Sequence, residues 1–484
     1  MRTLLSVLNV LGHLLLVSSL IYLLPITCAI IYRDGTLFTF VVSLVICVGV
    51  GGIITLATQR YRMELKARDG FILVTLSWVL ISAIATVPLM LHLHMSFTDA
   101  FFEMMSGLTT TGATVMVGLD TLAPSINLWR HAINWLGGMG IIVLAVAILP
   151  MLGVGGMQLF RAEVPGPIKD AKLTARIADT AAVLWVIYLV LTLACILSLW
   201  LVGMNWFDAI CHAFAALCLG GFSTRDASVG AFNSPAIEAV LIVFMVLAAL
   251  NFATHFTVWR ERSFRPYWRD AEVRGVLAII VLSCLGCAVY LWFGNVYASF
   301  WTALRYVSFN LVSIATDCGF VNTDYAQWPP FVPFWMLFLS SITVSSGSTG
   351  GGIKMIRTLI LVRQSGRELT RLLHPALAAP VTVGGMPIPN SVVVAILGFI
   401  FLYFMSIVAM TFLLIFGGLD FISAFSAVIA CINNAGPGLG VVGPATNYGS
   451  LTDFETWVLS FTMLLGRLEV FSLLVLFTPM FWRK

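Results

Sequence analysis

The sequence has few charged residues. Asp, Glu, Lys and Arg together make up 10% of its 484 residues, whereas 60% are hydrophobic. A soluble domain carries far more charge than this. Apolar runs long enough to cross about 30 Å of hydrocarbon recur along the chain. Composition therefore excludes a soluble protein and predicts a multi-pass membrane protein, with membrane lipid as its surroundings.

The sequence also lacks the residue sets that mark enzymes and cofactor sites. It has no HExxH motif, no Ser/His/Asp set and no histidines spaced as metal ligands. Cys284 and Cys287 form a lone CxxC inside an apolar run, where buried thiols are expected. The net charge of +4 does not indicate a nucleic-acid partner, because the basic residues lie in loops between apolar runs. We expect no enzyme and no cofactor in this chain.

One short segment occurs four times in the sequence. Each copy is a Phe-rich apolar segment that leads into a glycine with small or carbonyl-presenting neighbours. The glycines are about a hundred residues apart, which indicates an internal repeat. The copies are Thr109–Thr114, Leu219–Thr224, Thr316–Phe320 and Asn433–Gly438. One such segment would be an ordinary tight turn, whereas four in register predict a shared function.

The four glycine segments are typical of a carbonyl-lined cation filter. Glycine lets the backbone turn its carbonyls to one side, and four such loops can replace the water shell of a small cation. The predicted ligands are the backbone carbonyls of Thr111, Gly112, Gly220, Gly221, Cys318, Gly319, Ala435 and Gly436. A further, outer layer is expected from Thr110, Leu219, Asp317 and Asn434. Neutral carbonyls suit a monovalent cation, whereas a divalent site more usually has carboxylates.

The apolar runs divide the chain into two N-terminal spans and four repeats. The predicted units are 1–69, 70–178, 179–273, 274–388 and 389–484. Full spans are expected near residues 5–31, 37–58, 71–93, 127–155, 181–204, 235–258, 275–294, 331–362, 390–416 and 454–480. Half-length segments precede the glycines at 97–107, 206–217, 298–315 and 420–432, the third being about one helical turn longer.

The half-length segments decide the predicted architecture. Fewer than about 17 residues cannot cross the bilayer as a helix. Irregular backbone is tolerated at membrane depth only where protein buries it or where it lines water. The expected fold class is therefore all-α and polytopic, with two N-terminal spans plus four parallel span–pore helix–filter loop–span repeats around one central pore.

The basic residues predict the orientation of the chain. Most of the 26 Lys and Arg residues fall in Arg2, the loops between repeats, the end of the third repeat and the C-terminal tail. Only Arg33, Arg130 and Arg225 fall on the opposite side. By the positive-inside rule both termini are expected in the cytoplasm, with the glycine loops opening outward. The outer loops carry several Asp residues, which would concentrate cations or serve only as helix caps.

A second glycine-rich segment, Val344–Gly352, interrupts the last span of the third repeat. It fails the P-loop pattern, because Ile353 and Lys354 follow its last glycine. We interpret it as an intramembrane gate below the filter, with a packing break as the alternative. The predicted gate residues are Gly347, Gly350, Gly351, Gly352, Lys354 and Arg467.

Three ionisable residues in the apolar segments also need an explanation. Arg467 would set an electrostatic barrier in the pore or else pair with Glu469 to hold helices together. Glu103 and Arg305, in the predicted pore helices, are expected to form ion pairs that serve packing.

Taken together, these motifs resemble the Trk/Ktr/HKT superfamily of potassium transporters, and most closely its bacterial TrkH-type subunits. The resemblance covers the whole chain and rests on the four glycine loops, the Gly/Ser-rich break and Gly466-Arg467-Leu468-Glu469. It implies potassium as substrate, a homodimer with one pore per protomer, and a cytosolic nucleotide-binding regulatory subunit. Glycine in all four loops goes with preference for potassium over sodium in this superfamily. The third loop, Thr316-Asp317-Cys318, departs from the usual threonine-rich form.

The favoured hypothesis is potassium uptake across the bacterial inner membrane. The alternative is a proton- or sodium-coupled secondary cation transporter with alternating access, which would predict inverted repeats and paired broken helices. The repeats in this sequence are parallel. Whether protons or sodium are coupled to potassium entry stays open at this point.

Overall fold

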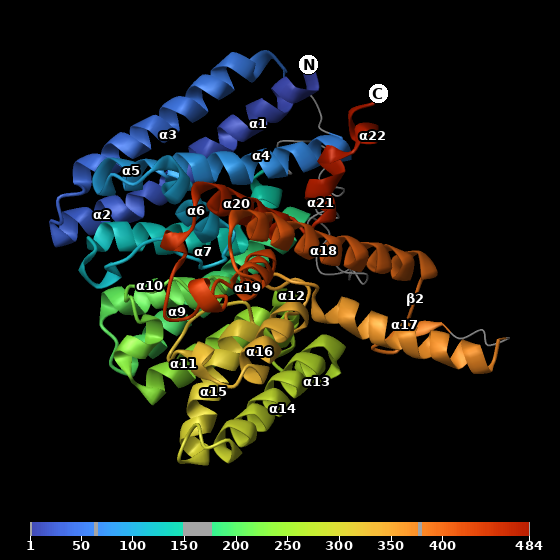
Figure 1. Cartoon of the computed structure of the whole chain (residues 1–484). Helices are drawn as coiled ribbons and strands as arrows, with labels where there is room; N and C mark the ends of the chain where they lie inside the picture. The colour runs from blue at the N-terminus through green and yellow to red at the C-terminus, as the bar shows by residue number, and fades with distance from the viewer. Residues whose placement is uncertain (1, 62–65, 149–176, 376–379, 484) are drawn as a thin grey trace.

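The computed structural model describes residues 2–61, 66–148, 177–375 and 380–483, and it is almost entirely helical (Figure 1). The described strands are β1 (Val381–Val383) and β2 (Met386–Ile388), an antiparallel hairpin in which Val381 pairs with Ile388. The predicted basic loop 161–176 lies outside the described residues.

Two N-terminal spans precede the repeats. The first consists of α1 (Arg2–Ser18), the 3₁₀ turn η1 (Ser19–Tyr22) and α2 (Leu23–Tyr32), and the second is α3 (Leu37–Thr58). In Figure 1, α3 runs back alongside α1. Both spans are largely apolar, and the polar turn Arg33–Thr36 connects them, so the pair forms a helical hairpin.

Each repeat begins with a long helix and a half-length helix. The long helices are α4 (Ala67–Ala85) with α5 (Val87–Leu93), α9 (Ile177–Leu201), α14 (Ala271–Phe293) and α18 (Asn390–Gly417). The half-length helices are α6 (Phe97–Leu108), α10 (Trp206–Cys218), α15 (Phe300–Ala315) and α19 (Phe421–Ile432). At 16 residues, α15 exceeds the 12, 13 and 12 of the others, as the sequence predicts.

The helices after the glycine loops differ between repeats. They are α7 (Pro124–Ile148); α11 (Pro235–Ala249) with α12 (Phe252–Glu261) and α13 (Arg265–Arg269); α16 (Phe331–Ile342) with α17 (Met355–Leu373); and α20 (Asp453–Arg467) with α21 (Phe471–Leu474) and α22 (Pro479–Trp482). Short 3₁₀ turns lie at Gln59–Tyr61, Leu119–Thr121, Ser228–Phe232, Tyr325–Gln327, Gly440–Val442, Tyr448–Ser450 and Val475–Phe477.

Six stretches of the described chain are long and apolar enough to cross a membrane, and two bent helix pairs raise the number to eight. The six are Leu4–Tyr32, Leu37–Tyr61, Arg68–Leu93, Val183–Leu201, Ala271–Phe293 and Asn390–Gly417. The predicted span 127–155 runs beyond the described residues, and the predicted span 331–362 is interrupted between Ile342 and Met355. The count of ten spans stays a prediction.

Two of the predicted spans, 235–258 and 454–480, contain bends that the sequence analysis did not predict. The pair α11 and α12 bends by 98°, and the pair formed by α20 and the 471–477 helix bends by 110°. At the first bend Leu250 has an extended backbone and Asn251 caps α12 by accepting the N–H of Ala253 at 2.8 Å. At the second, Glu469 and Val470 have φ of 55° and 48°. Neither site contains proline, the residue that most often marks a sharp kink in a helix.

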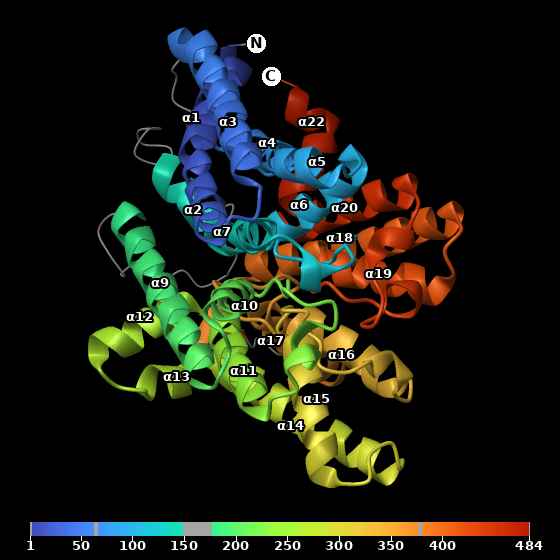
Figure 2. The same ribbon diagram turned by 90° about the vertical axis from the view of Figure 1, so that its left-hand side faces the viewer.

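The apolar core has two halves. One consists mainly of buried residues from α9 to α16, and the other of residues from α1 to α7 and from α18 to α21. Figures 1 and 2 show the same division, with the N-terminal and fourth-repeat helices together and the second and third repeats on the other side. The glycine loops meet between these halves.

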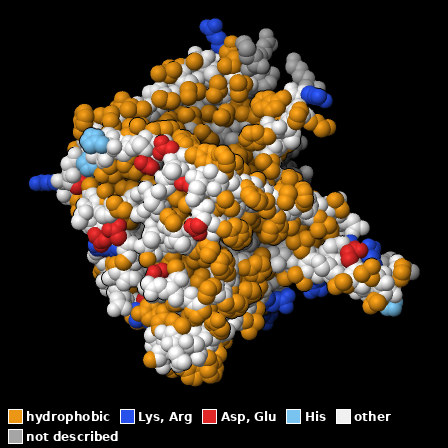
Figure 3. All heavy atoms as spheres, viewed as in Figure 1, with side chains coloured by type: hydrophobic (Ala, Val, Ile, Leu, Met, Phe, Trp, Pro, Cys, Tyr) orange, Lys and Arg blue, Asp and Glu red, His pale blue; other side chains and the backbone are white. Residues whose placement is uncertain are grey.

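The outer surface fits a membrane environment. Hydrophobic side chains cover most of the face in Figure 3. Both termini lie at the same end of the molecule (Figure 1), and Arg68 Nη1 donates a hydrogen bond of 3.0 Å to the carbonyl of Arg483. The chain is a membrane protein whose N-terminal region and C-terminal tail lie close together.

Candidate cation site at the four glycine loops

The half-length helices all begin in the same way. A polar side chain at the N-cap of each accepts a backbone N–H of the first turn, which satisfies a donor that the helix itself leaves unpaired. The caps are Ser96, Asn205, Ser299 and Asp420, whose side chains accept the N–H of Asp99, Asp208, Trp301 and Ser423 respectively. The start of each helix is therefore fixed by its own sequence.

The half-length helices also end in the same turn. The residue before each glycine donates its N–H to a carbonyl five residues earlier, which closes the helix end. The bonds are Thr111 to Ser106, Gly220 to Ala215, Cys318 to Ser313 and Ala435 to Ala430, at 2.8, 2.9, 2.8 and 2.8 Å. The same hydrogen-bonded turn therefore ends the helix in all four repeats.

Each turn contains two residues in the left-handed region. The glycines Gly112, Gly221, Gly319 and Gly436 have φ of 78°, 62°, 89° and 85°. The residues two positions earlier, Thr110, Leu219, Asp317 and Asn434, have φ of 57°, 56°, 63° and 58°. Residues that carry a side chain rarely adopt a positive φ, and backbone strain of this kind concentrates at functional sites. The same strained backbone at four equivalent positions indicates one shared purpose.

The four loops contact one another in a closed ring. A Cβ added to each glycine would meet the carbonyl oxygen that precedes the glycine of the next repeat. The contacts are Gly112 with Gly220 O, Gly221 with Cys318 O, Gly319 with Ala435 O and Gly436 with Thr111 O. The fourth contact returns to the first loop. No side chain fits at any of the four glycines without displacing a neighbouring strand.

Most of the predicted ligand carbonyls have no hydrogen-bond partner in the part of the chain that the structure describes. Among the described residues, those of Thr111, Gly112, Gly221, Cys318, Gly319 and Ala435 accept no hydrogen bond. Buried carbonyls are nearly always paired in folded proteins. Carbonyl rings of this kind can replace the hydration shell of a cation. The remaining two have partners, since Gly220 O accepts Asn134 Nδ2 at 3.2 Å and Gly436 O accepts the Tyr448 hydroxyl at 2.7 Å.

Three of the predicted outer-layer residues also contact other parts of the protein. Asp317 Oδ2 accepts the N–H of Gly351 at 3.1 Å. Asn434 Nδ2 donates to Thr111 Oγ1 at 3.0 Å and to the Met463 carbonyl at 3.1 Å. Leu219 is fully buried and lies against Gly350. Because these residues follow the helix ends directly, their side chains lie on the side of the ring that faces the second glycine-rich segment.

That second segment, residues 343–354, is called the Gly/Ser segment below. It lies between α16 and α17, and its backbone bonds to the second repeat. Ser345 N donates to Ala249 O at 3.0 Å, and Gly347 O accepts Phe252 N at 3.1 Å. These bonds satisfy the backbone groups that the bend between α11 and α12 exposes. The segment and the bend thus depend on each other.

Side chains from several helices hold the Gly/Ser segment. Glu272 Oε1 accepts the N–H groups of Ser346 and Ile356, at 2.9 and 3.1 Å, near its two ends. Arg467 donates 2.7 Å bonds to the carbonyls of Thr349 and Gly137. Lys354 Nζ donates to the carbonyl of Gly350.

The glycines of the Gly/Ser segment are in close contact with their surroundings. Cβ atoms on them would meet Asn251 at Gly347, Val344 at Gly350, Asn433 O at Gly351, and the carbonyls of Ser340 and Ser341 at Gly352. The contact with Asn433 O places the segment directly against the fourth glycine loop. The structure thus brings together all six residues predicted for the gate.

The predicted pairing of Arg467 with Glu469 is wrong. Glu469 instead binds Arg357 at 2.6 Å, and Arg467 donates to main-chain carbonyls. Residues two positions apart do not share a helical face, and α20 ends at Arg467, before the left-handed Glu469 with φ of 55°. Arg467 therefore ties the Gly/Ser segment to the first repeat.

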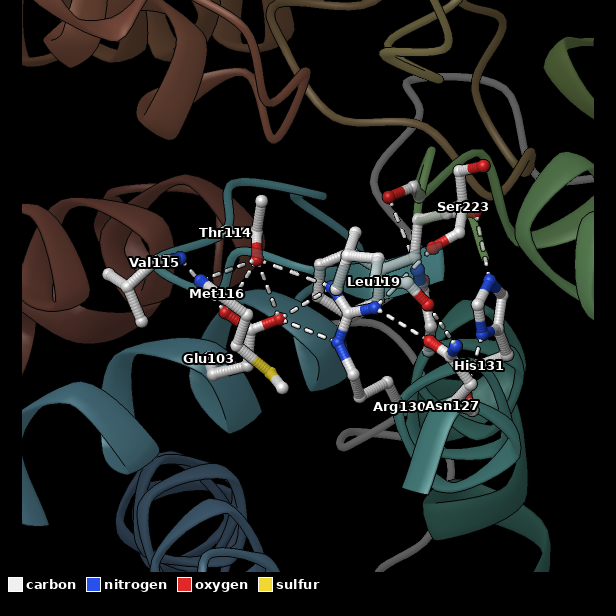
Figure 4. Close-up of polar contacts among 12 residues, drawn as sticks. Glu103, Thr114, Val115, Met116, Leu119, Asn127, Arg130, His131 and Ser223 are labelled. Atoms are coloured by element: carbon white, nitrogen blue, oxygen red, sulfur yellow. Dashed lines mark hydrogen bonds and ion pairs between the residues drawn. The ribbon is translucent and has the colours of Figure 1, made fainter. Parts of the chain in front are cut away.

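Sequence reasoning missed a polar cluster behind the ring, which Figure 4 shows. Asn127, Arg130, His131 and Asn134 lie on α7 with helical spacing, and all are buried. Polar residues at i, i+3, i+4 and i+7 share one face of a helix. In an apolar span this spacing could have indicated a buried polar face. Glu103 and Arg305 do form ion pairs, with Arg130 and Glu238, each at 2.7 Å.

No cluster of three or more His, Cys, Asp or Glu residues that could hold a metal ion occurs in the described ranges. The features above define a class: a helical membrane protein whose four glycine loops contact one another in a closed, buried ring. Comparison with known proteins gives the family. The model of the TrkH family, described as cation transport protein, matches residues 36–484, and the chain belongs to this family.

Individual relatives are similar over nearly their whole length. The Trk system potassium uptake proteins TrkH of Salmonella typhimurium and Vibrio parahaemolyticus are 45% and 47% identical over 481 and 483 residues, covering 99% of both chains in each case. TrkG of Escherichia coli is 39% identical over 478 residues, 98% of this chain and 97% of that protein. The crystal structure of the potassium transporter TrkH from V. parahaemolyticus superposes with a TM-score of 0.90 at 44% identity, covering 99% of this chain and 100% of that one.

Proposed function

We propose that this protein takes up potassium across the bacterial inner membrane, through the ring formed by the four glycine loops. The observation that carries the proposal is the closed ring itself, in which six predicted ligand carbonyls lack a hydrogen bond among the described residues. The printed names of the relatives, which are potassium uptake proteins, support potassium as the ion.

The Gly/Ser segment is proposed as the gate. It lies against the fourth loop and occupies the side of the ring that Asp317 and Leu219 face. In this position it would block a cation that leaves the ring. Arg467, a buried cation within hydrogen-bond distance of the segment, would add an electrostatic barrier.

Regulation by a cytosolic nucleotide-binding subunit and assembly as a homodimer are further parts of the proposal. The helix α17 continues directly from the Gly/Ser segment and projects from the body of the molecule in Figure 1. It exposes Leu369, Leu372 and Leu373 beside Arg363 and Arg371. A partner that binds this arm could pull on the segment.

Alternating access coupled to protons or sodium is not favoured. Inverted repeats would place successive loops in opposite directions. The four loops instead share one backbone turn and contact one another in chain order.

Uptake of radioactive rubidium into liposomes that contain purified protein tests the proposed function. We expect uptake that potassium competes with and sodium does not. Driving forces are imposed separately, as a voltage or as a proton gradient. Uptake that follows voltage alone supports the filter mechanism, and a strict requirement for a proton or sodium gradient would favour coupled transport.

The orientation has its own test. Both termini and the loop near Arg265 are proposed to be cytoplasmic, with Asp226 outside. A cysteine replacing Asp226 should react with an impermeant thiol reagent from outside, and a cysteine replacing Arg265 should not. Both positions are exposed, so burial does not decide the result. The reverse pattern would invert the proposed topology.

A further inference from the structure

A buried ion pair lies directly behind the ring (Figure 4). Arg130 Nη2 and Nε approach Glu103 Oε1 at 2.7 and 2.8 Å, and both side chains are 0% exposed. Glu103 is on the half-length helix α6, and Arg130 is on α7 of the same repeat. Burying two charges costs free energy that hydrogen bonds must offset.

Glu103 holds the first glycine loop after its turn. Its two carboxylate oxygens accept the Thr114 hydroxyl, each at 3.0 Å, and Oε2 accepts the N–H of Val115 at 3.0 Å. Thr114 Oγ1 in turn accepts Arg130 Nη2 at 3.3 Å. Thr114 and Val115 are two and three residues beyond Gly112, in the strand that leads away from the ring.

Arg130 and its neighbours on α7 hold the second glycine loop. Arg130 Nη1 donates to the carbonyl of Ser223 at 3.4 Å, and its guanidinium lies 4.4 Å from the centre of the Phe222 ring. His131 Nε2 binds the carbonyl of Phe222 at 3.0 Å. Together with the bond from Asn134 to Gly220 O, one face of α7 holds three carbonyls of the second loop and leaves that of Gly221 free.

The other repeats have hydrogen bonds near this position, but these bonds are not part of an Arg–Glu ion pair. Glu103, His212 and Asn310 each stand nine residues before their glycine. His212 Nε2 lies 2.9 Å from Ser223 Oγ, and Asn310 Oδ1 accepts the N–H of Asn322 at 3.3 Å. In the fourth repeat the equivalent residue is alanine, and the preceding Ser426 accepts the N–H of Leu439 at 2.8 Å. Only the first of these four residues is a carboxylate paired with an arginine.

We propose that the Glu103–Arg130 ion pair determines the ion selectivity of the ring, by bracing the strands of the first and second loops; this inference rests on the proposed function. The ring discriminates between cations only if its carbonyls keep their positions when a smaller cation enters. Neither residue contacts the ion. Both are positioning residues, and the charged pair makes the first two strands stiffer than neutral contacts would.

The test compares the unaltered protein with E103Q and with E103Q/R130Q. The single substitution leaves a buried guanidinium without its carboxylate, whereas the double substitution removes both charges. The measurement is the ratio of sodium to rubidium flux into liposomes with equal amounts of folded protein. We expect the double variant to raise this ratio about tenfold, which corresponds to about 1.4 kcal/mol of lost discrimination. Thr114→Val, which keeps the ion pair and removes the bridging hydroxyl, should raise it less.

The matched control is E238Q/R305Q. It removes an equally short Arg–Glu pair that joins α15 to α11 and that contacts no glycine-loop residue in the described part of the chain. A pair that serves only stability would leave the flux ratio unchanged in both double variants. This control should lower thermal stability and leave the ratio as in the unaltered protein.

The outcomes separate the inference from the proposed function. A raised ratio in E103Q/R130Q and in Thr114→Val, with the control unchanged, supports the inference. An unchanged ratio in these two variants overturns the inference and leaves the proposed function intact. An unaltered protein that does not prefer rubidium to sodium overturns both. If the double variant does not assemble, Thr114→Val decides between these results.

Discussion

The glycine loops and the Gly/Ser segment are both rich in glycine and buried, and the segment contacts the fourth loop directly. They are nevertheless held in place by different kinds of bonds. The turn of each loop is fixed by bonds within its own repeat: a capped helix start, a closing bond at the helix end and a left-handed glycine. The second loop has further bonds to α7 of the first repeat. The Gly/Ser segment occurs once. Its bonds go to α11, α12, α14 and Arg467, which belong to three different repeats.

This difference has a mechanical consequence. The local bonds of a loop persist as long as its helix does, so each loop keeps its own backbone turn when helices move relative to one another. Each bond of the Gly/Ser segment contributes only about 1 kcal/mol net, and all of them break if neighbouring helices shift. The ring is therefore suited to ion selection, and the segment is suited to moving aside.

The largest expected effect comes from breaking the ring. Gly221→Val should abolish potassium flux, because the new side chain meets Cys318 O and valine cannot adopt φ of 62° without strain. Gly221→Ser, with its smaller side chain, should pass more sodium. Rubidium uptake into liposomes measures both.

The matched control for this prediction is Gly286→Val, because a Cβ at Gly286 meets nothing within 4 Å. It should leave uptake unchanged. Normal potassium flux through folded Gly221→Val protein would show that the four loops do not form the ion path.

A smaller effect is expected from shortening the Gly/Ser segment. Deletion of Ser348–Gly352 should raise potassium flux about tenfold and weaken its dependence on the regulatory subunit, since the deleted residues carry the contacts with the ring and with Arg467. Initial uptake rates at equal protein content measure the change. Equal or lower flux from an assembled deletion variant would assign the segment to packing.

Arg467→Gln should raise flux by a smaller factor, about threefold. It removes a buried positive charge and weakens the bonds to Thr349 and Gly137, at a cost in stability of about 1–3 kcal/mol. Because Arg467 does not bind Glu469, the Arg357–Glu469 pair stays intact. Arg467→Lys keeps the charge and serves as the control, with flux closer to that of the unaltered protein. Lower flux in the Gln variant would contradict a barrier role.

The smallest effect is expected at a helix cap. Two hydrogen bonds from Ser423 lower the pKa of Asp420, and the bond from the Ser423 side chain has a larger effect than the bond from its N–H. A lowered pKa in the folded state stabilises the protein above the unfolded-state value near pH 4, and this contribution is lost as the pH falls through the folded-state pKa.

Asp420→Ala should therefore cost about 1 kcal/mol near neutral pH and less in acid, with ion selectivity unchanged. Thermal unfolding at a series of pH values measures this, and Asp420→Asn, which still caps, is the control. A change in the sodium-to-rubidium flux ratio would contradict the view that each cap acts locally.

The sequence predicted the parts of the structure that are local. Glycine positions, half-length apolar segments and the longer third copy are visible in the chain itself, and the helices occupy those positions. The spacing of the four glycines predicted equivalent loops, and these loops contact one another. The position of the Gly/Ser segment was predicted because glycine and serine are unusual inside an apolar span.

The long-range contacts could not be predicted from the sequence. The bends near Leu250 and Leu468 lie in apolar stretches without proline, and the first is satisfied by Gly347, about a hundred residues away. Arg467 binds carbonyls 118 and 330 residues distant, so the nearby Glu469 seemed the natural partner. Every residue has a main-chain carbonyl, so the residue types do not show which carbonyl will accept a hydrogen bond.

The central claim is that selection and gating reside in two separate glycine-rich elements. The most direct test is the ratio of sodium to rubidium flux in the Ser348–Gly352 deletion, measured together with its total flux. The account predicts a higher flux at an unchanged ratio, because the ring retains its own bonds. A ratio that rises together with the flux would show that the Gly/Ser segment takes part in selection and would contradict the separation.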